Sequence, residues 1–229
     1  MQQTIERKEN WHEDFIINLA AQFRPKVYVE LGLYQCELFN GVMPYAETLI
    51  GVDIFAEAGK WMKASEKATF VHSNTNDFAE ALKRNPISID MLFIDADHSK
   101  ESVLKDFWNF FPFVNYDGII LLHDSYPKNA EYTQPGYCGD GFKAIEELSK
   151  ETELYEMMTL PMHPGLTLCR KRKQHLPWLE VESTENAKTN AAYKIVVIAQ
   201  IFNELRKQNL ERFWNYIHPV CDALVVYDD

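Results

Sequence analysis

The sequence lacks the features that mark a membrane, secreted or disulfide-rich protein. No apolar run approaches the ~20 residues needed to span a bilayer. The N-terminus, MQQTIERKENWHEDF, is charged and has no apolar stretch of the kind found in signal peptides. The four cysteines lie far apart without CxxC spacing, which is typical of reduced thiols in an intracellular protein. We therefore expect a cytoplasmic protein without a membrane span.

Positive charge is also scarce, because 23 Lys and Arg face 34 Asp and Glu, for a net charge of −11. Binding to a phosphate backbone relies on Lys and Arg that displace counterions, so nucleic acid is not an expected partner. Apolar residues, by contrast, make up 46% of the 229 residues, which is ample for a packed core. The length has room for one sizeable domain and part of a second.

Short apolar runs alternate with helical patterns between residues 26 and 171. We predict strands at 26–32, 48–53, 69–73, 89–95 and 118–124, and helices at 76–84, 101–111 and 141–150. Asn76 or Asp77 is the expected cap of the first helix, and Asp117-Gly118 the expected turn before the fifth strand. Residues 154–160 and 166–171 flank Pro164-Gly165 and predict a terminal hairpin. This order predicts an α/β fold with a mostly parallel sheet.

Polar side chains collect at the carboxyl ends of these predicted strands, namely Glu30, Asp53, Ser73, Asp95 and Asp124. Ligands of parallel sheets bind at that edge. The sequence therefore predicts a site there.

The first turn, VELGLYQCELF, lacks the G-x-G-x-x-G of dinucleotide-binding domains and keeps only Gly32. Those glycines let backbone amides approach a pyrophosphate. A nicotinamide-dependent oxidoreductase is therefore not expected.

Five motifs, VELG, GVDIF, FVHSN, DMLFIDADHSKESVLKDF and DGIILLHDS, together resemble the Rossmann-like S-adenosylmethionine-dependent methyltransferases. The resemblance is greatest to small-molecule and sugar O-methyltransferases, and it covers about residues 12–172. It implies a seven-stranded sheet with helices on both faces and an antiparallel terminal hairpin.

The resemblance also assigns the cofactor contacts. It implies that Glu30 and Gly32 lie beside the methionine part of S-adenosylmethionine, that Asp53 holds the ribose, and that Ser73 and Asn74 lie at the adenine. Taken alone, Asp53 is equally compatible with a helix cap or a solvated acid.

Two further residues complete the predicted cofactor site. Phe55 is placed to cover an adenine face, although core packing is an equal alternative, and Asp95 ends the fourth strand. Cys36 stands where many relatives have a second glycine, which predicts crowding of the cofactor.

Methyl transfer to a hydroxyl requires removal of a proton, and Asp97 and His98 are the candidate bases. For His98 the alternatives are a cap of the following helix or a hydrogen bond to Asp106.

Asp95, His123 and Asp124 are candidate ligands for Mg²⁺ or another divalent cation, which would lower the pKa of the acceptor. Resemblance to the metal-dependent catechol-type methyltransferases places a metal at the two acids, but Ser125 stands where that group has Asn. A core position remains the alternative for His123.

Composition changes after the hairpin. Residues 173–190 are polar and predict a linker, and residues 191–229 resemble the truncated start of a nucleotide-sugar glycosyltransferase domain, with a strand, a helix and an acidic strand. That resemblance implies a sugar or glycan as the methyl acceptor.

The domains expected are therefore a methyltransferase at 1–172, a linker, and a fragment of a second domain. The expected function is O-methylation of a sugar, glycan or other small hydroxyl acceptor, with the need for a metal left open. The alternative is a non-catalytic cofactor-binding or scaffold domain attached to a glycosyltransferase.

Overall fold

The computed structural model describes residues 10–151, 153–172, 196–201 and 223–228. The chain divides into two compact units, Met1–His175 and Leu176–Asp229. Among the described residues, no helix is long and apolar enough to cross a membrane.

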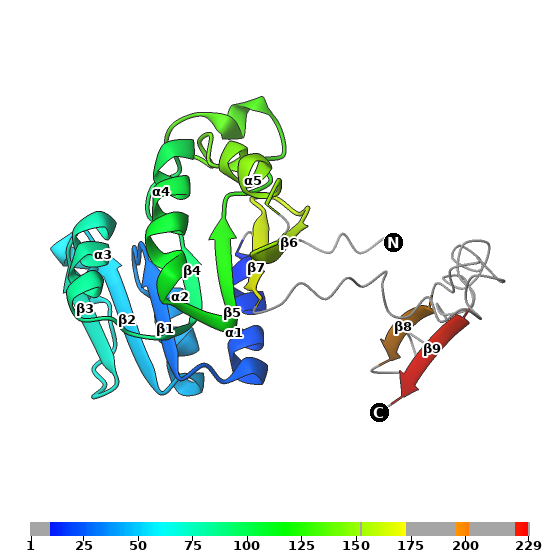
Figure 1. Cartoon of the computed structure of the whole chain (residues 1–229), viewed down its shortest axis with the longest axis horizontal. Helices are drawn as coiled ribbons and strands as arrows, with labels where there is room; N and C mark the ends of the chain where they lie inside the picture. The colour runs from blue at the N-terminus through cyan, green and yellow to red at the C-terminus, as the bar shows by residue number, and fades with distance from the viewer. Residues whose placement is uncertain (1–9, 152, 173–195, 202–222, 229) are drawn as a thin grey trace, which may run out of the picture. The chain divides into compact units, whose positions relative to one another are not determined.

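The first unit is built on a seven-stranded sheet in the order β3-β2-β1-β4-β5-β7-β6 (Figure 1). Its strands are β1 Val27–Leu31, β2 Thr48–Asp53, β3 Ala68–His72, β4 Ile89–Ile94, β5 Val114–His123, β6 Tyr155–Leu160 and β7 Leu166–Lys171. The first five are parallel, and β7 runs antiparallel to β5 and β6. The predicted mixed sheet with its terminal hairpin is confirmed.

Helices cover both faces of this sheet, as predicted. On one face, Phe78, Phe107 and Ala144 join the core from α3 Thr75–Arg84, α4 Lys100–Phe110 and α5 Phe142–Leu148. On the other face, Ile16 and Phe39 come from α1 Trp11–Phe23 and α2 Glu37–Val42. Short 3-10 helices are η1 Met43–Tyr45, η2 Ala56–Lys60, η3 Phe111–Phe113 and η4 Ala130–Thr133.

Helix α1 forms where the sequence patterns predict no element. Its buried positions, His12, Ile16 and Ala20, recur every four residues, which is the spacing of one helical face. Because one of these positions is a histidine, the apolar spacing in the sequence is incomplete and does not predict the helix.

The predicted turn at Asp117-Gly118 is wrong, because β5 begins at Val114 and runs through both residues. The register against β4 shifts there, and Asp117 takes a left-handed φ of 64°. A Cβ on Gly118 would come within 2.8 Å of the Asn115 carbonyl oxygen. The dipeptide therefore marks an irregularity inside the strand.

The second unit is described only as two parallel strands, β8 Val196–Ile201 and β9 Ala223–Asp228. The helix predicted between them and the linker 173–190 lie outside the described residues. The glycosyltransferase resemblance of 191–229 stays a prediction.

Candidate functional site

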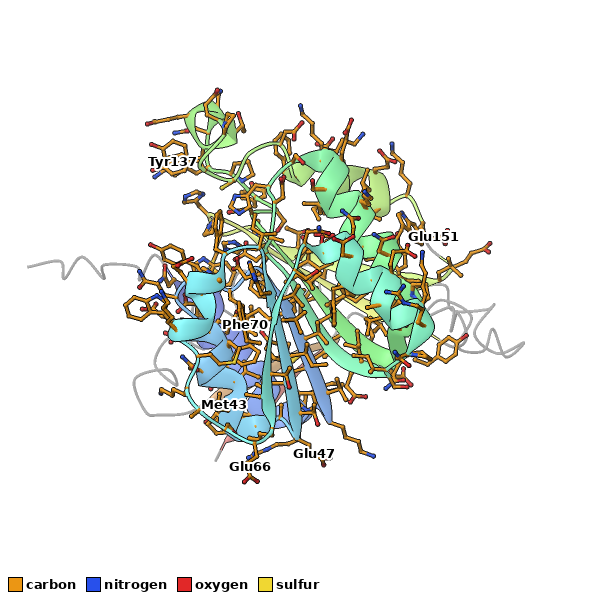
Figure 2. All side chains as sticks on the ribbon, turned by 90° about the vertical axis from the view of Figure 1, so that its left-hand side faces the viewer. Met43, Glu47, Glu66, Phe70, Tyr137 and Glu151 are labelled. Atoms are coloured by element: carbon orange, nitrogen blue, oxygen red, sulfur yellow. The ribbon has the colours of Figure 1, made fainter. Side chains whose placement is uncertain are left out.

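The carboxyl ends of the parallel strands open into one cleft of about 920 Å³. Figure 2 shows Tyr137, on the loop after β5, at this end of the sheet and Glu47, which precedes β2, at the other end. Every predicted site residue except Asp124 lines the cleft, and Asp124 contacts the cleft residue His98. The structure therefore brings together the residues that the sequence assigned to this edge of the sheet.

Gly32 lets the end of β1 pass against the end of β4. Its φ is +86°, and a Cβ there would lie 2.2 Å from the Asp95 carbonyl oxygen. Its amide donates to the Val52 carbonyl oxygen at 2.9 Å. The glycine is required by backbone contact at the floor of the cleft.

The predicted crowding by Cys36 does not occur. The thiol is buried in the core, where it donates to the Ala58 carbonyl oxygen at 3.2 Å, and Cys36 is absent from the cleft lining. Its backbone φ of 57° keeps the tight turn that a glycine would also allow.

Asp53 accepts hydrogen bonds from backbone amides around the cleft. One carboxylate oxygen accepts from the amides of Leu33 and Tyr34 at 2.9 and 3.3 Å, and the other accepts from the Phe55 amide at 2.8 Å. The oxygen that accepts only from Phe55 keeps a second lone pair for a ligand hydroxyl. Phe55 is 65% exposed, so the core alternative for this ring is wrong.

Glu30 is a buried acid at the floor of the same end, with 2% of its surface exposed. It accepts a hydrogen bond from the Tyr28 hydroxyl. Burial raises the pKa of Glu30 well above its usual value. A cationic group of a ligand would compensate this carboxylate.

Ser73 and Asn74, the predicted adenine residues, use their side chains locally. Ser73 Oγ donates to the Asn74 carbonyl oxygen at 2.9 Å. Asn74 caps α3, because its side-chain oxygen accepts from the Asp77 amide and its amide nitrogen donates to the Asp77 carboxylate. The predicted cap at Asn76 or Asp77 is therefore wrong by two or three positions.

Four ionisable side chains meet at the ends of β4 and β5. His123 Nδ1 lies 2.9 Å from Asp95 Oδ1 and 3.5 Å from Asp124 Oδ2. His98 Nδ1 lies 2.9 Å from Asp124 Oδ2, and its Nε2 lies 3.6 Å from Asp95 Oδ1. The two carboxylates and the two histidines therefore form one alternating network.

This network sets the charge state of its members. Hydrogen bonding to Asp124 raises the pKa of His98 to about 9. Burial opposes a charge on His123, but Asp95 and Asp124 raise its pKa to about 10. Burial likewise opposes a charge on Asp124, yet bonds from the two histidines hold its pKa far below the usual range. Without a cation, both imidazoles carry protons at neutral pH.

Asp95, His98 and Asp124 each present one ligand atom, and these atoms lie within 4.8 Å of one another. Carboxylate oxygens are ligands suited to Mg²⁺ or Mn²⁺, and an imidazole nitrogen suits a transition metal. The predicted ligand set differs, because it contained His123 where the geometry brings in His98.

Asp97 and His98, the two candidate bases, differ in their surroundings. Asp97 is exposed, and its Oδ1 accepts from the Ser99 amide at 2.7 Å, which lowers its pKa. Ser99, not His98, caps α4 through a bond from the Ser102 amide, so the capping alternative for His98 is wrong.

His12 is a residue of this site that sequence reasoning missed. It is 7% exposed, lines the cleft, and its ring centroid lies 4.1 Å from that of His123. Burial and His123 lower its pKa to about 4, so His12 is neutral. The spacing of His12, Ile16 and Ala20 marks His12 as a buried position of α1. That spacing does not show that His12 contacts His123 at the end of β5.

Comparisons with known proteins agree with this geometry. Residues 29–125 match a family model described as a methyltransferase domain. An uncharacterized protein of Acanthamoeba polyphaga mimivirus is 31% identical over 129 residues, 49% of this chain and 58% of the relative. The chain therefore spans less than two thirds of that relative.

Solved structures share the fold at low sequence identity. An O-methyltransferase from Bacillus cereus in complex with SAH has a TM-score of 0.60 at 10% identity, covering 73% of this chain and 84% of that chain. The O-methyltransferase TomG from Streptomyces achromogenes in complex with SAM has a TM-score of 0.55 at 13% identity, with 72% and 82% covered. A putative caffeoyl-CoA O-methyltransferase from Staphylococcus aureus has a TM-score of 0.59 at 16% identity, with 72% and 85% covered.

Proposed function

Since the chain carries a Rossmann-like, S-adenosylmethionine-dependent methyltransferase domain, we propose that it methylates a hydroxyl of a small molecule or glycan. The observation that carries the proposal is the network of Asp95, His98, His123 and Asp124 beside the floor of the cleft at Glu30. It puts proton acceptors and potential metal ligands next to the proposed methionine end of the cofactor.

In this proposal the cofactor lies along the cleft. Glu30 faces the ammonium group of its methionine part, because a buried carboxylate is favoured by a cation. Asp53 accepts from a ribose hydroxyl with the lone pair that remains on Oδ1. Phe55, which is exposed beside the cleft, covers one face of the adenine.

The reaction is an in-line displacement at the methyl carbon. The acceptor oxygen bonds to that carbon, the carbon–sulfur bond breaks, and the acceptor proton goes to a base. We assign the base to His98 ahead of Asp97. In the unliganded protein the His98 imidazole is protonated at neutral pH, so it must first release that proton to solvent, which the positive charge of the bound sulfonium favours. Asp124 orients the ring at 2.9 Å, whereas Asp97 accepts from the Ser99 amide at the start of α4. Orientation by a carboxylate holds an imidazole in one position, as in other acid–histidine pairs.

A divalent cation fits the three-ligand group of Asp95, His98 and Asp124 by donor type and spacing. When bound, such an ion lowers the pKa of an acceptor hydroxyl and orients it. If His98 served as a metal ligand, Asp97 would remain as the base. The two roles of His98 are therefore alternatives that experiment separates.

We assign the acceptor side of the site to the aromatic residues near His98, which lie outside the lining of the cleft. The ring centroids of Tyr137 and Tyr132 are 5.3 Å apart, and those of Tyr132 and His163 are 4.3 Å apart. The Tyr137 carbonyl oxygen also contacts His98 Nδ1. Aromatic faces suit the apolar face of a sugar ring or a planar acceptor, and this supports a small hydroxyl compound or glycan as substrate.

The neighbouring structures include O-methyltransferases and also the N-methyltransferase NodS from Bradyrhizobium japonicum, at a TM-score of 0.55. The fold alone therefore does not decide between oxygen and nitrogen acceptors. The proposal of oxygen rests on the base and the candidate metal ligands.

The test is formation of S-adenosylhomocysteine by the full chain with methyl glycosides, phenols and amines as acceptors. His98→Ala should lower turnover by about a hundredfold or more while the protein still binds cofactor. Asp97→Asn, which keeps an oxygen for the Ser99 amide, is the matched variant and should retain turnover. Loss of turnover in Asp97→Asn alone would move the base to Asp97.

The metal is tested separately, by activity with and without chelator and by Mn²⁺ titration of the wild type and Asp124→Asn. A metal-dependent enzyme loses activity in chelator, and Asp124→Asn loses Mn²⁺ binding. Full activity in chelator contradicts the metal. Cofactor binding without turnover on any acceptor favours the alternative of a non-catalytic domain.

A further inference from the structure

Asp106 is a buried acid that the proposed reaction does not use. It lies on α4, is 2% exposed, and lines the cleft together with Thr75, Asn76 and Ser102. This end of the cleft is formed by residues of α3 and α4.

The carboxyl of Asp106 has spare hydrogen-bonding capacity. Burial raises its pKa to about 6, and a side-chain hydrogen bond with Thr75 opposes that shift. A carboxyl group has about four acceptor positions, of which Thr75 takes one. A buried acid with so few partners is costly unless a ligand completes them.

The other polar side chains at this end are already engaged. Ser73 and Asn74 use their side chains at the start of α3, as described above. The Asn76 side-chain oxygen accepts from Asn109 Nδ2 at 3.1 Å. Asp106 is thus the buried side chain at this end with acceptor positions to offer.

We infer that Asp106 recognises the amino edge of the cofactor's adenine. The inference rests on the proposed cofactor position, in which Asp53 holds the ribose and the base extends toward α3 and α4. The 6-amino group of adenine donates a hydrogen bond, and the adjacent N1 accepts one. A carboxylate accepts from the amino group, and a protonated carboxyl group also donates to N1.

The test compares two ligands that differ only at that edge. Calorimetry of the full chain measures the affinities of S-adenosylhomocysteine and of its purine analogue, in which a hydrogen replaces the 6-amino group and N1 remains an acceptor. Wild type should prefer the adenosyl compound at least tenfold, since a lost hydrogen bond to a charged or buried partner has that effect. Asp106→Ala should reduce this preference to about twofold or less.

Two controls separate recognition from a structural role. Asp106→Asn presents an amide that pairs with both adenine positions, so it should retain the preference. Thr75→Val removes the neighbouring hydroxyl and leaves Asp106, so it should also retain the preference. A change in stability alone shifts both affinities together and leaves their ratio unchanged.

The outcomes are distinguishable. An unchanged ratio in folded Asp106→Ala overturns the inference and leaves the proposed function intact. If Asp106→Ala fails to fold, loss of the preference in Asp106→Leu, or its retention there, decides the question in the same way. Absence of any binding by the wild type overturns the proposed cofactor site itself.

Discussion

At the end of the cleft formed by β1 and β2, polar side chains accept hydrogen bonds from backbone amides. At the ends of β4 and β5, polar side chains mainly pair with one another. Asp53 accepts from three backbone amides, and Gly32 lies against the backbone of Asp95. In contrast, His98 and His123 share the carboxylates of Asp95 and Asp124.

This difference separates two kinds of defect. A change at the first end alters the shape of the cleft, so it affects stability and cofactor affinity. A change at the second end alters the charge of a network made mainly of side-chain contacts, so it affects turnover.

The largest expected effect is on stability at Gly32. In Gly32→Ala the new Cβ would meet the Asp95 carbonyl oxygen at 2.2 Å, so the ends of β1 and β4 must separate. We expect the free energy of unfolding to fall by about 3 kcal/mol or more. The measurement is denaturant unfolding followed by circular dichroism.

Gly136→Ala is the matched control, because Gly136 has a similar φ of +89° but nothing within 4 Å of the added Cβ. It carries only the cost of the left-handed backbone, about 1–2 kcal/mol. Equal losses in the two variants would show that backbone strain, and not contact with β4, makes glycine necessary at Gly32.

A smaller effect is expected in the pH dependence of stability at Asp106. The folded pKa, raised by burial to about 6, exceeds the usual unfolded value of about 3.9. Stability from this group is therefore full below about pH 3.9 and is lost as the pH rises through 6. Asp106→Asn should remove a loss of about 2–3 kcal/mol between those limits.

Asp97→Asn is a control on the same segment with the opposite sign. Hydrogen bonds from Ser99 lower the pKa of Asp97, so its contribution is present above the unfolded pKa and is lost as the pH falls through the folded pKa. Unfolding curves of both variants between pH 3 and pH 8 check the two directions. A pH profile of Asp106→Asn identical to wild type contradicts the prediction.

The smallest effect is expected from the C-terminal unit. All residues that line the described cleft belong to Met1–His175. Removal of 176–229 should therefore change the affinity for S-adenosylhomocysteine by less than about twofold, which is within ~0.4 kcal/mol. A truncated chain that does not fold would show that the predicted domain boundary is wrong.

The sequence predicts the sheet well because its buried strands are nearly continuous apolar runs. Strands β2 and β7 begin and end where expected, and the hairpin follows from Pro164-Gly165. Strand β5 is predicted to begin four residues too late, since the segment around Asp117 is polar. Helix α1 is missed because a histidine occupies one position of its buried face.

The site is predictable in its location but only partly in its contacts. Strand ends converge by topology, so Glu30, Asp53 and Asp95 were placed in one cleft from strand boundaries alone. Which atoms pair depends on side-chain geometry across strands. Sequence spacing does not predict the contact between His98 and Asp124. The meeting of His12 with His123 likewise arises only when α1 packs on the sheet.

The central claim, that one end of the cleft binds the cofactor and the other performs the transfer, is tested most directly by calorimetric titration of S-adenosylhomocysteine into three proteins. Wild type should bind with one site. Asp53→Ala should bind at least tenfold more weakly, because it loses a charge-assisted hydrogen bond worth ~1.5–3 kcal/mol. His98→Ala should bind within about twofold of wild type. Unchanged affinity in Asp53→Ala, or an equal loss in His98→Ala, would contradict the account.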